Sequence, residues 1–92
     1  MTSSTLEQPV FWKDGTVLRK ESFGGLIARP QHGVIDVLSH SAFQYTAYRL
    51  HGANSEEACE KIAKRYGISP EQVRTDMKII EHQLSNHGYI TN

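Results

Sequence analysis

The chain lacks most of the features that would link it to redox chemistry, secretion or a membrane. Its one cysteine, Cys59, cannot form an internal disulfide and falls short of the several thiolates that an iron–sulfur cluster needs. No apolar run approaches the roughly 20 residues of a membrane span, and no basic-then-apolar leader opens the sequence. These absences predict a cytoplasmic protein that does not associate with membranes.

The sequence also lacks an excess of charge of either sign. Ten Lys and Arg residues balance ten Asp and Glu residues, so the formal net charge is zero. Proteins that bind nucleic acid use a basic face to neutralise phosphates. The balance therefore weighs against nucleic acid as a partner.

Side chains that could support catalysis are scattered. His82 and His87 lie five residues apart, which places them about 140° apart around a helix, too far to share a metal ion. Cys59 occupies a position typical of a small core residue. Gly24-Gly25 is followed by neither a helix nor Lys-Ser/Thr, so it is not a phosphate loop. We expect no catalytic residue, no metal and no cofactor, and hence a binding protein and not an enzyme.

The first 38 residues predict a small sheet. Branched and apolar residues predict strands at 17–20, 26–29 and 34–38, with 30–33 as the hairpin loop between the last two. Residues 9–12 are predicted to form an extended arm before a tight turn at Asp14-Gly15. Phe23-Gly24-Gly25 is predicted to be a flexible break. The segment 34–38 carries a single charge, at Asp36, and as the last of the predicted strands it is expected to lie at an edge of the sheet.

The rest of the chain predicts three helices. Ser39 or Ser41 caps the first, in which Phe43, Ala47 and Leu50 form an apolar stripe. Asn54 and Glu57 form a capping box for the second, which turns Ala58 or Cys59, Ile62 and Tyr66 inward. Ser69-Pro70 begins the third, whose core stripe is Val73, Met77, Ile80 and Leu84. Tyr89-Ile90 then folds back.

This order of elements predicts an α+β fold: a winged helix-turn-helix with an N-terminal three-stranded antiparallel sheet followed by three helices. Ninety-two residues suffice for one domain, so residues 1–92 are expected to form a single domain with residues 1–9 frayed.

The third helix has two polar flanks with different compositions. One flank carries Arg74, Lys78, Glu81 and Ser85 and is typical of a solvated face whose side chains pair with one another three and four positions apart. The other carries Gln72, Asp76, Ile79 and Gln83. Ile79 lies well off the core stripe. It is either a single exposed apolar residue, or one covered by the amino-terminal arm, or part of a groove.

Three segments together resemble PqqD-like proteins, with similarity covering roughly residues 17–90. The first is Leu18-Arg19-Lys20-Glu21 with Phe23-Gly24-Gly25-Leu26-Ile27, and the second is Gly33-Val34-Ile35-Asp36-Val37-Leu38-Ser39. The third is the helical part, from Ser41-Ala42-Phe43-Gln44-Tyr45 through Tyr66-Gly67-Ile68-Ser69-Pro70-Glu71-Gln72-Val73 to Gly88-Tyr89-Ile90. Their combination and order are more specific than any single motif.

The resemblance implies a recognition protein for ribosomally synthesised, post-translationally modified peptides. Such a chaperone binds the leader of a precursor peptide and presents it to a maturation enzyme, often a radical S-adenosylmethionine protein. In that family the leader adds a strand to the third strand and lies beside the third helix. Carried onto this chain, the peptide-binding residues are Val34, Ile35, Asp36, Val37 and Leu38 of the strand and Gln72, Asp76, Ile79 and Gln83 of the helix.

The chain departs from the family at Asp36, where members often have an aromatic residue. The sequence leaves open which face of this strand is buried and which of its amides point outward.

Two other functions remain possible from the sequence. One is a winged helix-turn-helix DNA-binding transcriptional regulator that reads DNA with its third helix. Residues 69–88 carry three acidic and two strongly basic side chains, which offer little to phosphates. The other is a subunit or dimerisation module without a peptide ligand.

Overall fold

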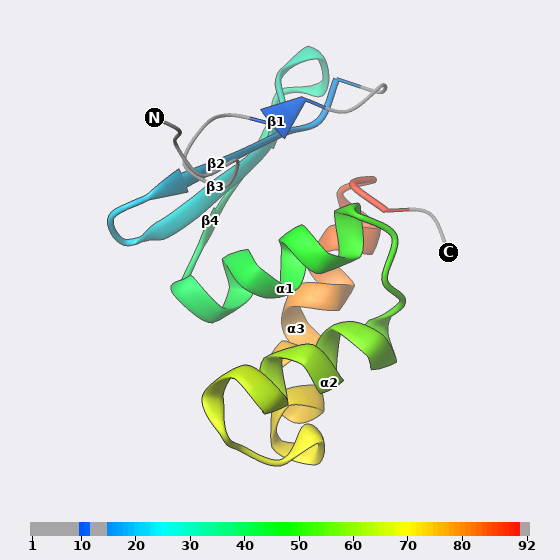
Figure 1. Cartoon of the computed structure of the whole chain (residues 1–92). Coiled ribbons are helices and arrows are strands. Elements are labelled where there is room, and N and C mark those ends of the chain that lie inside the picture. The colour runs from blue at the N-terminus through cyan, green and yellow to red at the C-terminus, as the bar shows by residue number, and fades with distance from the viewer. Residues whose placement is uncertain (1–9, 12–14, 91–92) are drawn as a thin grey trace. The chain divides into compact units, whose positions relative to one another are not determined.

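The computed structural model describes residues 10–11 and 15–90, which form an α+β fold. An antiparallel sheet comes first and three helices follow (Figure 1), so the predicted class and order of elements are confirmed. The chain divides into two compact units, Met1–Phe43 and Gln44–Asn92. Among the described residues, every helix is too short or too polar to cross a lipid bilayer.

The sheet has four strands in the order β1-β2-β3-β4, each antiparallel to its neighbour (Figure 1). Three of them match the predicted strands: β2 is Val17–Glu21, β3 is Gly24–Arg29 and β4 is Val34–Leu38. The sheet has one strand more than predicted, because β1, Val10–Phe11, pairs with β2 where the sequence predicts an extended arm. Asp14 of the predicted tight turn lies outside the described residues.

The register of the strands identifies the covered face of the sheet. Leu18 lies opposite Ile27, and Ile27 lies opposite Asp36, so these three side chains share one face. Leu18 and Ile27 are fully buried, as are Leu38 on the same face of β4 and Phe43. The core of the first unit therefore lies on this face.

The connection between β3 and β4 is the predicted hairpin loop. Pro30–His32 form one turn of 3-10 helix, and Gly33 follows in the left-handed conformation with φ of +68°. The amide of Gly33 donates a hydrogen bond to the carbonyl oxygen of Pro30 at 3.1 Å. Glycine is suited to this position because it has no Cβ to strain.

The prediction of a flexible break at residues 23–25 is wrong for Gly24 and Gly25, whereas Phe23 lies in the turn before β3. Gly24 and Gly25 are buried and begin β3, where Gly24 pairs with Glu21 and Gly25 with Lys20. A Cβ on Gly25 would lie 2.3 Å from Cδ1 of Phe43. The glycines are there because the strand lies too close to its neighbours for a side chain, a tertiary reason that composition alone does not reveal.

Helix α1 spans His40–Leu50. The Ser39 Oγ accepts a hydrogen bond from the Ala42 amide at 3.2 Å. Of the two predicted candidates for the cap, Ser39 is therefore the one that caps the helix. Of the predicted stripe, Phe43 and Ala47 are buried and Leu50 is half-buried.

Helix α2, Ser55–Tyr66, has the predicted capping box. The Glu57 amide donates to Asn54 Oδ1 at 2.8 Å, and the Asn54 amide donates to Glu57 Oε1 at 2.9 Å. Its buried residues are Ala58, Cys59, Ile62 and Ala63. Tyr66 is exposed, contrary to the prediction, because it is the last residue of the helix.

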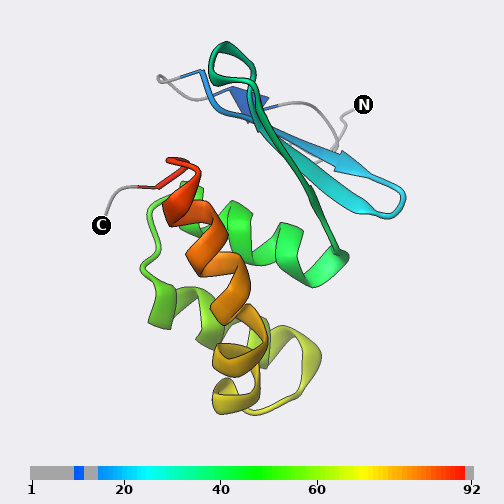
Figure 2. The same cartoon turned by 180° about the vertical axis from the view of Figure 1, so that it is seen from behind.

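Helix α3, Pro70–Asn86, packs against α2 after a short turn (Figure 2). Ser69 caps it by accepting a hydrogen bond from the Gln72 amide at 3.1 Å. Three residues of the predicted core stripe are buried, whereas Ile80 is half-buried. Tyr89 is buried after the helix ends, and its amide donates to the Leu84 carbonyl oxygen at 2.9 Å, so the predicted return of the chain is confirmed.

Candidate functional site

Strand β4 lies at the edge of the sheet, as predicted. It pairs with β3 and with no other described strand (Figure 1). One row of its backbone amides and carbonyls therefore has no partner strand within the described part of the chain. The strand contains no proline that would prevent pairing along its length. The strand, and with it this open edge, is five residues long.

The side chains of β4 alternate between two environments, which answers the question of its buried face. Leu38 is buried, and Val34 and Asp36 on the same face are half-buried. On the opposite face the side chains of Ile35 and Val37 are 64% and 70% exposed. Asp36 therefore lies on the covered face, opposite the buried Ile27.

The second predicted surface is the flank of α3 that carries Gln72, Asp76, Ile79 and Gln83. All four residues are exposed. Gln72 Nε2 donates a hydrogen bond to Asp76 Oδ1 at 2.9 Å, so these two side chains engage each other one turn apart. Ile79 is 71% exposed, which leaves a branched apolar side chain in contact with water.

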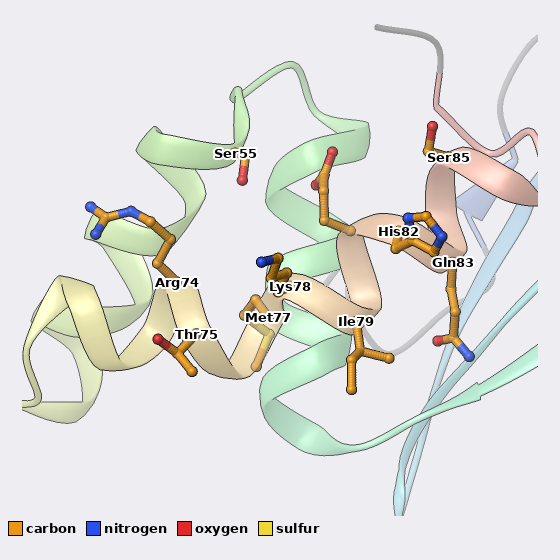
Figure 3. A pocket seen from close by; sticks show the side chains of 10 residues that line it. Ser55, Arg74, Thr75, Met77, Lys78, Ile79, His82, Gln83 and Ser85 are labelled. Carbon is orange, nitrogen blue, oxygen red and sulfur yellow. The ribbon is translucent and has the colours of Figure 1, made fainter.

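A groove of about 790 Å³ runs over α3, and Ile79 and Gln83 line it (Figure 3). Gln72 and Asp76 do not line it, so the groove includes half of the predicted flank. All four residues of the other flank of α3 line it as well, together with His82: Arg74, Lys78, Glu81 and Ser85. Sequence reasoning assigned none of these five residues to a site. For Lys78 and His82 the available signal was proximity, because both lie within one turn of Ile79. The groove combines an apolar side chain with polar and cationic neighbours.

A polar network holds α1 and α3 of the second unit together. Glu81 Oε1 accepts hydrogen bonds from the Tyr45 hydroxyl and from Arg49 Nε, the latter at 2.8 Å. Glu81 Oε2 accepts from Arg49 Nη2, also at 2.8 Å. Arg49 Nη1 donates to the Ala53 carbonyl oxygen at 2.8 Å, and Tyr45 shares a hydrogen bond with Ser55 Oγ.

The network overturns the prediction that Glu81 belongs to a solvated face. Its partner Arg49 has a side chain only 7% exposed, and that of Glu81 is 23% exposed. The hydrogen bond to Glu81 raises the pKa of Arg49. Burial, and then the hydrogen bond to Glu81, raises the pKa of Tyr45, so its phenol stays neutral and can donate. The network thus holds α3, the helix that carries Ile79, against α1.

A second Arg–Glu pair joins α3 to α2 at the surface. Arg74 Nε donates to Glu56 Oε1 at 3.1 Å and Arg74 Nη2 to Glu56 Oε2 at 2.6 Å. The side chains are 46% and 54% exposed. Sequence periodicity predicts pairing along α3 itself, but Arg74 pairs with a residue 18 positions earlier because α2 lies alongside.

We expect the pKa of Glu56 to lie below its usual value. The hydrogen bonds from Arg74 favour the carboxylate, so the folded state keeps Glu56 ionised at lower pH than the unfolded state does. The contribution of the pair to stability is thus present above the unfolded pKa and is lost as pH falls through the folded pKa. A ¹³C carboxyl NMR titration measures the folded value. Arg74→Gln should raise it, and an unchanged value in that variant would contradict the assignment.

Within residues 10–11 and 15–90, no three His, Cys, Asp or Glu side chains lie close enough together to hold a metal ion. Cys59 is buried in α2, and burial raises the pKa of its thiol. A raised pKa lowers the fraction of reactive thiolate, which fits the predicted role of Cys59 as a core residue.

Comparison of the chain with protein-family models, with curated proteins and with solved structures finds no match.

Proposed function

We propose that this protein is a non-catalytic peptide chaperone of the cytoplasm. It binds the leader region of a ribosomally synthesised precursor peptide as an added strand on β4 and presents the precursor to a modifying enzyme. The observation that carries the proposal is the open edge of β4, five residues long and without proline. An open edge of this kind invites pairing with another chain, and proteins normally block it.

Strand addition suits a presenting protein for a physical reason. The backbone of the added strand supplies hydrogen bonds whatever its side chains are, and alternate side chains supply selectivity. The protein can therefore hold a leader firmly and leave the rest of the precursor available to an enzyme.

The resemblance to PqqD-like proteins narrows the ligand and the partner. It supports a leader peptide as the ligand and a radical S-adenosylmethionine enzyme as the partner, within a winged helix-turn-helix arrangement. The helix flank with Ile79 is the second surface that the resemblance assigns to the leader.

A pair of proline variants tests strand addition. Successive amides of a strand point in opposite directions, so of Asp36 and Val37 one donates toward β3 and the other toward the open edge. We expect one of Asp36→Pro and Val37→Pro to destabilise the fold strongly, because it loses a hydrogen bond within the sheet. The other variant should keep its melting temperature within a few degrees and lose peptide binding at least about tenfold.

The probe is a peptide selected from a displayed library of random nine-residue sequences, titrated into ¹⁵N-labelled protein. Binding should shift the amide signals of residues 34–38. If the folded proline variant binds the selected peptide as tightly as the wild type does, strand addition at β4 is wrong.

Replacing Ile79 with aspartate tests the helix flank. Because Ile79 is exposed, Ile79→Asp should leave thermal stability nearly unchanged. It should weaken binding of the selected peptide about tenfold or more if the ligand covers this apolar side chain. Leu84→Asp is the matched control, since Leu84 is buried in the same helix and a buried carboxylate should unfold the second unit. Normal binding by Ile79→Asp would remove this flank from the site.

A further inference from the structure

The outer face of the sheet carries an apolar cluster whose members on β4 are exposed within the described part of the chain. Register places Ile35 opposite Ala28 and Val37 opposite Leu26, and Ala28 lies opposite Val17, so all five side chains share this face. We call these five residues the outer cluster. Ile35 and Val37 are among the most exposed large apolar side chains described. The exposure increases toward the edge, where β4 ends the sheet.

Charge is confined to the margin of the outer cluster. Arg19 lies on the same face, opposite Leu26, and its Nε lies 2.7 Å from Glu21 Oε2. These two charges balance each other, and none of the five cluster residues is charged. A ligand that matches such a face presents apolar, uncharged side chains to it.

In a sheet, directly opposed apolar side chains on neighbouring strands stabilise each other. Ile35 and Val37 have such partners on the β3 side, and on the open side no described residue provides one. A strand added to β4 would place two of its residues, two positions apart, beside Ile35 and Val37. The residue between them would point to the other face, beside Asp36.

We infer that the bound peptide carries apolar side chains, branched or aromatic, at two alternating positions that pair with Ile35 and Val37 on the outer face, with a non-acidic residue between them. This inference rests on the proposed function and specifies its ligand class. The peptide extends the outer cluster by one strand and covers its most exposed members.

The charge of β4 argues that the occupant is a peptide and not a second copy of the chain. An antiparallel pairing of two β4 strands that sets Ile35 against Val37 of the other copy also sets Asp36 against Asp36. Like charges directly opposite each other destabilise a strand pair. The same repulsion disfavours Asp or Glu at the middle position of the peptide.

The test selects nine-residue peptides from a random displayed library on the wild type and on the double variant Ile35→Thr/Val37→Thr. Threonine keeps the branched shape and strand propensity and removes apolar surface from an exposed face, so the fold should persist, as thermal melting will check. The wild type should enrich an apolar–non-acidic–apolar pattern. A peptide so selected should bind the double variant about 2- to 30-fold more weakly.

Val17→Thr is the matched control, because it makes the same change in the outer cluster on β2, away from the open edge. It should leave affinity unchanged. Amide shifts of residues 34–38 in ¹⁵N spectra report where each selected peptide binds, and sedimentation reports self-association.

Peptides that shift residues 34–38 but lack the alternating pattern, or that bind the double variant equally well, would overturn the inference and leave strand addition intact. A library that yields no binder, or binders that leave residues 34–38 unshifted, would overturn the proposed function as well. A wild-type dimer with residues 34–38 at its interface would assign the edge to a second copy.

Discussion

Replacing Glu81 with alanine is expected to lower the free energy of unfolding by about 3 kcal/mol. The substitution removes both hydrogen bonds that the Arg49 guanidinium donates to a carboxylate, and the Arg49 side chain is almost entirely buried. A buried cation that loses its counter-ion keeps its desolvation cost without the compensating attraction. The acceptor of the Tyr45 hydroxyl is lost too. Urea denaturation followed by the helical circular dichroism signal measures the change.

The surface pair of Arg74 and Glu56 provides a matched control with the same chemistry. There, as in the buried pair, one arginine Nε and one Nη2 donate to the two oxygens of a glutamate. The two pairs differ mainly in exposure. Glu56→Ala should therefore shift the urea midpoint far less than Glu81→Ala, because water solvates Arg74 in either case. Equal shifts in the two variants would show that burial does not govern the strength of the Glu81 network.

Replacing Gly24 with alanine is expected to destabilise the sheet by about 3 kcal/mol or more. Gly24 has a φ of +141°, a conformation that residues with a side chain rarely adopt. A Cβ would also lie 2.1 Å from the carbonyl oxygen of Leu38 and 2.5 Å from the carbonyl carbon of Ser39. These are backbone atoms, so neither can move aside without shifting β4 or the start of α1. Loss of amide dispersion in the signals of residues 17–38, or their rapid hydrogen exchange, would report the damage.

Gly33→Ala is a control that separates the cost of backbone strain from the cost of a clash between the new Cβ and neighbouring atoms. Gly33 also has a positive φ, of +68°, but nothing lies within 4 Å of the position its Cβ would take. This variant should cost about 1–2 kcal/mol from conformation alone. If Gly24→Ala costs no more than Gly33→Ala, the contact between Gly24 and the start of α1 does not constrain the first unit.

Features that depend on neighbours in sequence were predictable. The capping box of Asn54 and Glu57, the Ser69 cap and the hairpin loop ending at Gly33 each arise within four residues, where local hydrogen bonds and backbone preferences decide the structure. The same holds for β4, whose branched residues predict a strand and whose place in the chain predicts an edge. The strand at residues 34–38 therefore appears with its predicted bounds.

Features that depend on distant residues were not predictable. Glu81 follows the period of a solvated flank, yet it binds Arg49, 32 residues earlier, because α1 brings that guanidinium to it. Gly24 and Gly25 have the composition of a flexible break, yet they are fixed in β3 by the close approach of other backbone and of the Phe43 ring. In both cases tertiary packing determines which residue lies next to which, and the spacing of residues along the sequence does not reveal this.

The sequence by itself determined the α+β class, the caps and turns, and a strand at residues 34–38 with one charge at its centre. Only the tertiary structure decided that Asp36 faces the covered side of the sheet and that Ile35 and Val37 face water. The reason is that alternation fixes which residues of a strand share a face, whereas the identity of the buried face depends on what the sheet packs against.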